Sequence, residues 1–228
     1  LIPCYNHGAM LASVLARLAP FDLPVIIVDD GSDAQTKQHI AALTAPQLEI
    51  LTLPHNQGKG AAVIAGMRKA AAAGYTHVLQ LDADGQHQVE DTPRMLAEAE
   101  RHPHCLISGQ PIYDASIPKS RLYGRYITHF WVWVETLSFS LKDSMCGFRV
   151  YPLQPSLSLC DRRAIGQRMD FDTEIMVRLY WQGTPSRFIS TRVTYPATGL
   201  SHFDALRDNL RISWMHTRLF FGMLPRIP

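Results

Sequence analysis

Residues 25–32 read Val25-Ile26-Ile27-Val28-Asp29-Asp30-Gly31-Ser32, a short β-branched run that ends in two acidic residues and a glycine. This pattern predicts a buried strand followed by a turn. Helix-like segments lie on either side of it, at residues 9–18 and 34–43, and Ser32 or Asp33 is a suitable N-cap for the second. A strand between two helices is the unit from which α/β folds with parallel sheets are built.

The same alternation continues along the first half of the chain, and helices dominate the second half. Apolar runs predict further strands at residues 48–53, 77–81, 105–109 and 188–195. Helical patterns cover residues 61–73, 91–101, 122–141, 171–181 and 203–224. We therefore predict one α/β domain with a mostly parallel, Rossmann-like central sheet, flanking helices and a helical C-terminal extension. Ligands of such sheets bind beyond the carboxyl ends of the strands.

Composition narrows the class of protein. The chain has 228 residues, of which 46% are hydrophobic and 18% are charged, which excludes a disordered chain. A formal charge of +2 gives no basic excess for nucleic acid, so we expect no nucleic-acid partner. The four cysteines form no CxxC pair, so we expect reduced thiols and a cytoplasmic protein. No signal peptide or run of 18 apolar residues is visible, and the start at Leu1 leads us to expect missing preceding residues.

Two carboxylates follow the predicted strand at residues 77–81. Asp82 and Asp84 stand at positions i and i+2, which point the same way on an extended chain. Two such oxygens suit a hard divalent cation, and Gln86 and His87 can extend its coordination. Taken alone, the pair is better explained by a solvated turn before Gly85, and the neighbouring motifs reverse that preference.

Two other strand ends carry polar groups. The carboxylates of Asp29 and Asp30 can accept hydrogen bonds from a base or a ribose, or can cap the following helix. The segment Asn56-Gln57-Gly58-Lys59-Gly60 offers close backbone approach and a positive charge before a helix N-terminus. It matches neither the Walker A loop nor the dinucleotide fingerprint, and a plain strand-to-helix turn remains an alternative.

Four motifs in order resemble glycosyltransferase family 2, the GT-A type of nucleotide-sugar transferase: Ile2–Asn6, Val28–Ser32, Asn56–Gly60 and Asp82–His87. Two downstream segments, Lys142–Arg149 and Phe171–Glu174, are similar to those of dolichyl-phosphate glucose/mannose synthases. The resemblance covers residues 1 to about 185. It implies a GT-A fold and an inverting, metal-dependent hexosyltransferase. The acceptor it implies is a polyprenyl phosphate or a lipid or envelope-glycan precursor.

The resemblance also implies roles for particular residues. The nucleotide sugar would be held by Pro3, Tyr5, Asn6, Asp29, Asp30, Lys59 and Asp82. Mg²⁺ or Mn²⁺ would be held by Asp82, Asp84 and Gln86. The catalytic carboxylates would be Asp84, Asp143 and Asp172, with Asp143 near the acceptor. For Asp143 and Asp172, helix capping or pairing with Arg149 is an equal alternative.

The second half would serve the acceptor. We expect Arg121, Arg125 and Arg149 to bind an anionic acceptor, although Arg121 and Arg125 also suit a solvated basic face. Residues 1–110 would then form the donor half and residues 111–228 the acceptor half of one domain. The aromatic stretch at residues 130–139 favours core or dimer packing. The oligomeric state stays open.

Aromatic and basic residues alternate in the terminal helix at residues 203–224. This composition suits peripheral contact with the cytoplasmic face of a membrane, and packing on the domain is an equal alternative. Two other function classes stay open. One is a non-catalytic nucleotide- or glycan-binding module. The other is a sugar-nucleotide nucleotidyltransferase, which needs a glycine-rich basic loop where this chain has Pro3-Cys4-Tyr5-Asn6-His7-Gly8.

Overall fold

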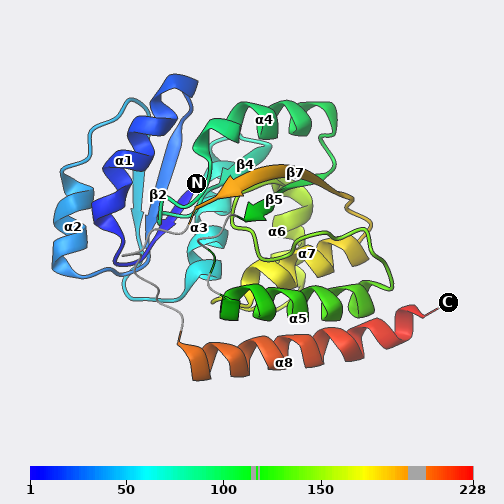
Figure 1. The fold of residues 1–228 in the computed structure, drawn as a ribbon. Helices are drawn as coiled ribbons and strands as arrows, with labels where there is room; N and C mark the ends of the chain where they lie inside the picture. Colours follow the sequence, from blue (N-terminus) through cyan, green and yellow to red (C-terminus); the bar gives the residue numbers. More distant parts are fainter. Residues whose placement is uncertain (114–116, 118, 195–203, 228) are drawn as a thin grey trace.

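The computed structural model describes residues 1–113, 117, 119–194 and 204–227 (Figure 1). The strands are β1 (Ile2–Cys4), β2 (Val25–Asp29), β3 (Leu48–Thr52), β4 (His77–Gln80), β5 (Leu106–Tyr113), β6 (Arg149–Pro152) and β7 (Ser186–Val193). The helices are α1 (Gly8–Leu18), α2 (Ala34–Ala41), α3 (Lys59–Ala72), α4 (Thr92–Arg101), α5 (Lys119–Thr136), α6 (Leu153–Arg162), α7 (Phe171–Trp181) and α8 (Ala205–Met223). The predicted alternation of strands and helices is confirmed.

The strands form one mixed sheet at the centre of the molecule. Strands β1, β2 and β3 pair in parallel, and a second group has the order β4-β6-β5-β7. The Leu1 nitrogen donates to the Leu79 carbonyl at 2.8 Å, and the Leu81 nitrogen donates to the Leu1 carbonyl at 3.0 Å. These two bonds join the groups into the order β3-β2-β1-β4-β6-β5-β7. Among the strands of the described residues, only β6 runs antiparallel to its neighbours, so the sheet is mostly parallel as predicted.

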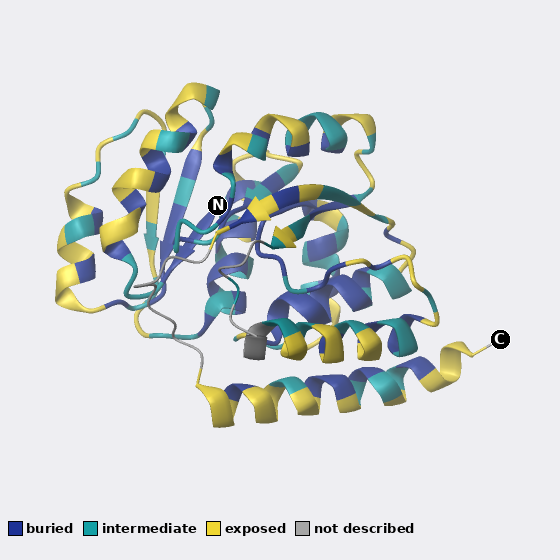
Figure 2. Ribbon diagram, viewed as in Figure 1, coloured by how far each residue is buried: buried dark blue, intermediate teal, exposed yellow. Residues whose placement is uncertain are grey.

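Helices cover both faces of this sheet. One hydrophobic core lies beneath α1, α2 and α4. The other lies beneath α3, α6 and α7, and it also takes in buried side chains of α5 and α8. Helices α5 and α8 lie side by side as an outer layer below α7 (Figure 1). In Figure 2 both helices are buried toward the domain and exposed on the opposite side.

Two elements were not predicted from the sequence. Strand β6 has four residues and includes a buried arginine, Arg149, and a proline, so it lacks the apolar run that signals a strand. Helix α6 follows it directly and carries Pro155 in its first turn, where proline is tolerated. Helix α5 was predicted to reach residue 141 but ends at Thr136, before Leu137, whose φ is +50°.

Within the described residues, no helix is both long and apolar enough to cross a membrane.

Candidate functional site

A cavity of about 1280 Å³ opens at the carboxyl ends of β1, β2 and β4 and continues between α5 and α8. Its first part is lined by polar side chains that follow these strands, among them Asp30, Asp82, Asp84 and Gln86. This placement is the one expected for a parallel sheet, because strands of one direction bring their carboxyl ends to the same edge.

Strand β1 and the turn after it contribute two of their three predicted residues to the cavity. Pro3 and Tyr5 line it, as does Cys4, where burial raises the pKa of the thiol to about 11. Asn6 instead holds the loop between β2 and α2. Its Oδ1 accepts a hydrogen bond from the Asp33 nitrogen at 2.9 Å, and its own backbone nitrogen donates to the Ser32 hydroxyl. The predicted nucleotide contact of Asn6 is therefore not supported by its position.

The adjacent acidic residues Asp29 and Asp30 have different surroundings. Asp29 is buried, accepts a hydrogen bond from the Ser32 nitrogen at 2.9 Å and does not line the cavity, so its predicted ligand contact is replaced by a loop role. Asp30 lines the cavity, and burial raises the pKa of its carboxyl. The N-cap of α2 is Asp33, whose carboxylate accepts from the Thr36 nitrogen at 2.7 Å.

Asp30 holds the turn that leads into α3. Its oxygens accept hydrogen bonds from the backbone nitrogens of Gln57 and Gly58, both at 2.7 Å, and from the Asn56 amide at 3.1 Å. Gly58 has a φ of +105°, and a Cβ there would collide with the backbone of Gln167. Because Gly58 has no side chain, the loop before α7 can approach its backbone closely. From the sequence, we had expected a ligand to make this close approach.

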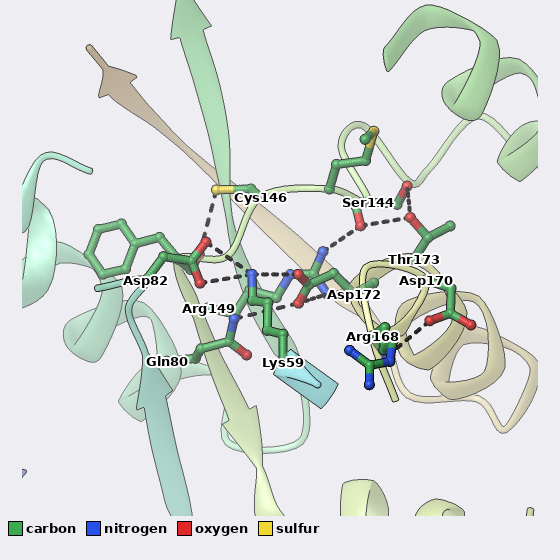
Figure 3. A network of polar contacts seen from close by, with 12 residues as sticks. Lys59, Gln80, Asp82, Ser144, Cys146, Arg149, Arg168, Asp170, Asp172 and Thr173 are labelled. Atoms are coloured by element: carbon green, nitrogen blue, oxygen red, sulfur yellow. Dashed lines mark hydrogen bonds and ion pairs between the residues drawn. The ribbon is translucent and has the colours of Figure 1, made fainter. Parts of the chain in front are cut away.

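Lys59 lies between two carboxylates from distant parts of the chain (Figure 3). Its Nζ is 2.8 Å from Asp82 Oδ1 and 2.7 Å from Asp172 Oδ2. Burial opposes the charged ammonium, but the two carboxylates outweigh it and raise the pKa of Lys59. Asp172 is buried and is not among the residues that line the cavity, so its position favours a role in holding Lys59 over the predicted catalytic role.

Asp82 and Asp84 face the cavity at the end of β4. Burial opposes ionisation of Asp82, but Lys59 and His87 outweigh it and hold the pKa of this carboxyl below its ordinary value. Gly147 packs directly behind Asp82, and a Cβ at this glycine would collide with the carboxylate. Asp84 Oδ1 accepts a hydrogen bond from the Gln86 nitrogen at 3.0 Å, which fixes the turn.

These groups fit a divalent cation that is shared with a ligand. The described part of the chain contains no group of three or more His, Cys, Asp or Glu side chains that could hold a metal ion. Mg²⁺ is commonly bound by one or two carboxylates together with phosphate oxygens of a substrate. The two carboxylates and the Gln86 amide on the wall of one cavity match that donor set.

Asp143 lies behind the cavity wall and not on it. Its Oδ1 accepts hydrogen bonds from the Met145 and Cys146 nitrogens at 2.9 and 2.8 Å, and its Oδ2 is 3.1 Å from Arg125 Nε and 3.3 Å from His129 Nε2. Burial opposes ionisation, but His129 and Arg125 outweigh it and lower the pKa of Asp143. The predicted catalytic carboxylate is therefore a positioning residue for Arg125, which does line the cavity.

Of the other predicted acceptor residues, Arg149 does not join Arg125. Arg149 is fully buried, and its guanidinium donates to the carbonyls of Ser144 and Asp172, both at 2.6 Å, and to the Tyr151 hydroxyl at 3.2 Å. It crosslinks β6 to α7 and cannot reach an acceptor, which corrects the prediction. Arg121 belongs to α5, but its side chain lies outside the described residues.

Arg168 is a cavity residue that sequence reasoning missed. It lies in the loop before α7, and its guanidinium donates to the Asn56 side-chain oxygen at 2.7 Å. This contact brings a basic residue of the second half of the chain to the polar end of the cavity. The loop carries no motif, so the only signal was an isolated arginine between two turns.

The second part of the cavity is a groove between α5 and α8 with both apolar and polar walls; the polar lining residues are Thr128, Asp208, Asn209, Ser213, His216 and Thr217. Its walls include Tyr123, Ile127 and Trp131 of α5 and Ile212 and Phe220 of α8. Trp131 meets Phe220 edge to face, with ring centroids 6.2 Å apart. The cavity thus joins a charged end at the sheet to an end under the outer helices where large apolar side chains and polar side chains both line the wall.

Comparison with known proteins agrees with this geometry. Residues 1–168 match the sequence model of the family described as Glycosyl transferase family 2. The chain is 32% identical over 158 residues to the undecaprenyl-phosphate mannosyltransferase of Micrococcus luteus, covering 66% of this chain and 64% of that protein. It is 26% identical over 199 residues to the dolichyl-phosphate beta-glucosyltransferase of Dictyostelium discoideum, covering 77% and 60%. The chain therefore aligns with less than two thirds of the length of these relatives.

A solved structure shares the fold. Glucosyl-3-phosphoglycerate synthase from Mycobacterium tuberculosis, in complex with Mn²⁺ and uridine-diphosphate-glucose, superposes with a TM-score of 0.68 at 16% identity. The match covers 100% of this chain and 78% of that chain. The predicted fold class, an α/β GT-A type sheet with a helical C-terminal extension, is thereby confirmed.

Proposed function

The chain belongs to glycosyl transferase family 2, and from this premise we propose that it transfers a sugar from a nucleotide-diphosphate sugar to a polyprenyl phosphate. The proposed reaction inverts the anomeric carbon and depends on Mg²⁺ or Mn²⁺. The names of the aligned relatives, which refer to undecaprenyl and dolichyl phosphates, support the acceptor class. The proposal concerns a chain that matches only part of those proteins.

The observation that carries this proposal is the continuous cavity. Its polar end, with Asp30, Lys59 and Asp84, suits a charged nucleotide sugar. The large apolar side chains at its other end, Trp131 and Phe220, suit a hydrocarbon. A polyprenyl phosphate that enters between α5 and α8 would present its anionic head group toward the sheet edge. One connected space therefore suits both substrates of the proposed transfer.

The donor end supplies charge stabilisation. Asp82, Asp84 and Gln86 would hold the divalent cation, which when bound neutralises charge on the departing nucleoside diphosphate. Lys59 keeps the Asp82 carboxylate in place through their 2.8 Å ion pair. Arg168 is the further cation on this wall and is our candidate contact for the diphosphate.

The acceptor end needs no general base. A phosphate acceptor is already anionic at neutral pH, so its oxygen can attack without losing a proton. Asp143 accordingly has no proton to accept, and its ion pair holds Arg125 at the cavity wall. Arg125 is our candidate contact for the acceptor phosphate.

We also propose that the domain has a donor half at residues 1–110 and an acceptor half at residues 111–228. Arg168 belongs to the acceptor half but reaches the donor end of the cavity.

We also propose that the outer face of α5 and α8 rests on an anionic membrane surface. Large apolar side chains on this face are exposed, namely Tyr126, Phe130, Leu206, Leu210, Trp214 and Phe221. Arg207 and Arg211 are exposed on the same helix as the tryptophan, which suits anionic head groups. The groove between the two helices would then admit a lipid acceptor directly from the bilayer. The cytoplasmic side of that membrane remains our prediction.

The test is a transfer assay with undecaprenyl phosphate and a panel of UDP-, GDP- and dTDP-sugars, with and without Mn²⁺. We expect one donor to give a glycosyl lipid only when metal is present, with an inverted anomeric configuration by NMR. Asp84→Ala should lower turnover about a hundredfold or more while the fold survives. Asp161→Ala, which removes a carboxylate from an exposed ion pair with Arg68, is the matched control.

Three outcomes would contradict this proposal. Metal-dependent nucleotide binding without turnover would favour a non-catalytic binding module. A retained anomeric configuration would refute inversion. Equal activity of wild type and the Asp84 variant would remove that carboxylate from the cation site.

A further inference from the structure

A buried carboxylate on α7 joins three parts of the chain. Glu174 is fully buried, and its Oε1 accepts hydrogen bonds from Arg178 of the same helix, with Nε at 2.8 Å and Nη2 at 2.7 Å. Its Oε2 accepts from Arg218 Nη2 of α8 at 3.0 Å and from the backbone nitrogen of Gly166 at 2.8 Å. Gly166 lies in the loop before α7, so one side chain connects this loop to an outer helix.

Charge pairing explains only part of this arrangement. Two guanidinium groups balance the charge of the buried Glu174 carboxylate, and Arg178 is its i, i+4 partner on the helix. The backbone N–H of Gly166 carries no net charge. Its bond to Oε2 therefore serves the position of the loop and not the neutralisation of Glu174.

A second carboxylate holds the same loop. A Cβ at Gly166 would collide with the Asp170 carboxylate, so the absence of a side chain lets the loop pack directly against Asp170. Asp170 Oδ1 also accepts a hydrogen bond from the Arg168 backbone nitrogen at 3.1 Å (Figure 3). Glu174 and Asp170 together hold the loop against the start of α7.

The same loop contacts the donor end of the cavity. The Gln167 carbonyl accepts hydrogen bonds from the Gly60 and Ala61 nitrogens at 2.8 and 3.3 Å, at the N-terminus of α3. Within the described residues, the Arg168 guanidinium donates two bonds to Asn56, at 2.7 and 3.4 Å. A guanidinium has five N–H donors, so Arg168 can bind a ligand oxygen while it stays bound to Asn56.

We propose that Glu174 is a positioning residue that holds Arg168 in place for the diphosphate of the nucleotide sugar. The inference rests on the proposed function, in which Arg168 is the candidate diphosphate contact. Glu174 is not among the residues that line the cavity. It acts through the backbone of Gly166, two residues before Arg168, and Arg218 extends the connection to α8.

Loss of this support should weaken nucleotide binding. Glu174→Gln removes the charge, and Glu174→Asp keeps the charge but shortens the side chain, so the carboxylate no longer reaches Gly166. We expect either variant to raise the Kd of a nucleoside diphosphate about fivefold. Calorimetry with Mn²⁺ measures this Kd for whichever of UDP, GDP and dTDP binds wild type most tightly. The aspartate variant provides the test if the neutral variant does not fold.

A double-mutant cycle separates positioning from general destabilisation. Arg168→Met should itself raise the Kd about tenfold. In that background, Glu174→Asp should change the Kd by less than about twofold, because the residue through which it acts is gone. If Glu174→Asp raises the Kd by the same factor in both backgrounds, Glu174 does not act through Arg168 and the proposal is wrong.

Two control variants break ion pairs without removing the Gly166 contact. Arg178→Met affects only the pairing at Oε1 of Glu174, so it should leave the Kd unchanged. Glu98 of α4 also pairs with two arginines, Arg101 of its own helix and Arg187 of β7, and its side chain is 12% exposed. Glu98→Gln should likewise leave the Kd unchanged. An equal rise of the Kd in these controls and in Glu174→Asp would overturn the proposal.

Hydrogen exchange gives a readout that needs no ligand. We expect peptides that cover residues 163–170 to exchange faster in Glu174→Asp than in wild type, and unchanged exchange would overturn the positioning role. Nucleotide binding with the expected cycle but without sugar transfer would retain the inference and reject the transfer function. Sugar transfer with additive effects in the cycle would do the reverse. Failure of all three nucleotides to bind would overturn both.

Discussion

The Lys59 ammonium pairs with two carboxylates, Asp82 in the turn after β4 at 2.8 Å and Asp172 of α7 at 2.7 Å. Replacement of Lys59 by methionine leaves both carboxylates without their cation in a largely buried place. We expect Lys59→Met to lower the free energy of unfolding by about 2 kcal/mol, since removing one partner of a buried pair leaves an uncompensated charge. Urea unfolding monitored by circular dichroism gives this value.

Two further variants test the cause. Lys69 on the same helix pairs with Glu49, but both side chains are substantially exposed, so Lys69→Met should change stability by less than about 0.5 kcal/mol. Addition of Asp172→Asn to Lys59→Met should recover part of the loss, because it removes one of the two orphaned charges. No recovery would assign the loss to packing of the lysine stem.

Asp143 makes stability depend on pH in a known direction. Its pKa is lowered in the folded protein because His129 and Arg125 outweigh burial. A group with a lowered folded pKa contributes stability above its unfolded pKa of about 3.9, and this contribution is lost as the pH falls through the folded value. Wild type should therefore exceed Asp143→Asn by about 2 kcal/mol at pH 7, and the difference should shrink below about pH 4. A difference that stays constant from pH 7 to pH 3 would contradict the ion-pair assignment.

Single elements show what sequence patterns can and cannot predict. The ends of β2 and β4 were located correctly, because a β-branched run followed by Asp-Asp-Gly or Asp-Ala-Asp has few structural alternatives. The sequence did not predict in the same way which charged side chains are turned toward the interior of the fold. Arg149 was assigned to the acceptor, and Asp143 and Asp172 were assigned catalytic roles. In the fold, Arg149 donates to the Asp172 carbonyl, Asp143 pairs with Arg125 and Asp172 pairs with Lys59. A sequence shows which charges exist but not which of them neutralise one another inside the fold.

The groove was missed for a related reason. Trp131 and His216 are 85 residues apart in the chain, and only the packing of α5 on α8 brings them together. The aromatic stretch at residues 130–139 and the terminal helix were interpreted separately, each with packing as an alternative. Both interpretations apply in part, because each helix has one buried and one exposed side.

Helix α8 allows a direct comparison of its two sides. Leu219 is fully buried in the core, whereas Leu210 is 62% exposed. We expect Leu219→Ala to lower the free energy of unfolding by about 3 kcal/mol through the cavity it creates. Leu210→Ala on the same helix should change it by less than about 0.5 kcal/mol. Chemical unfolding of both variants measures the difference, and equal effects would mean that α8 is not docked on the domain as described.

At the scale of the whole molecule, the two halves of the chain meet at one cavity. The N-terminal half provides the strand ends, and the C-terminal half provides the groove and Arg168. This arrangement places the charged end of the cavity at the sheet and the groove beside the exposed face of α5 and α8. An acceptor with a charged head and a hydrocarbon tail would match both ends, and a bilayer against that face would supply such an acceptor directly.

Vesicle binding tests this orientation. We expect the protein to co-sediment with vesicles that contain phosphatidylglycerol, more strongly than with pure phosphatidylcholine, and to be released by added salt. Trp214 is 62% exposed and Phe221 is 63% exposed, so the double variant Trp214→Ser/Phe221→Ser should weaken vesicle binding about tenfold or more without lowering stability appreciably. The matched control is Ile50→Ser/Tyr75→Ser, which removes exposed apolar side chains at 42% and 47% exposure from other parts of the surface. If both double variants bind vesicles equally well, the face of α5 and α8 is not the membrane contact, and the groove must take its acceptor from solution.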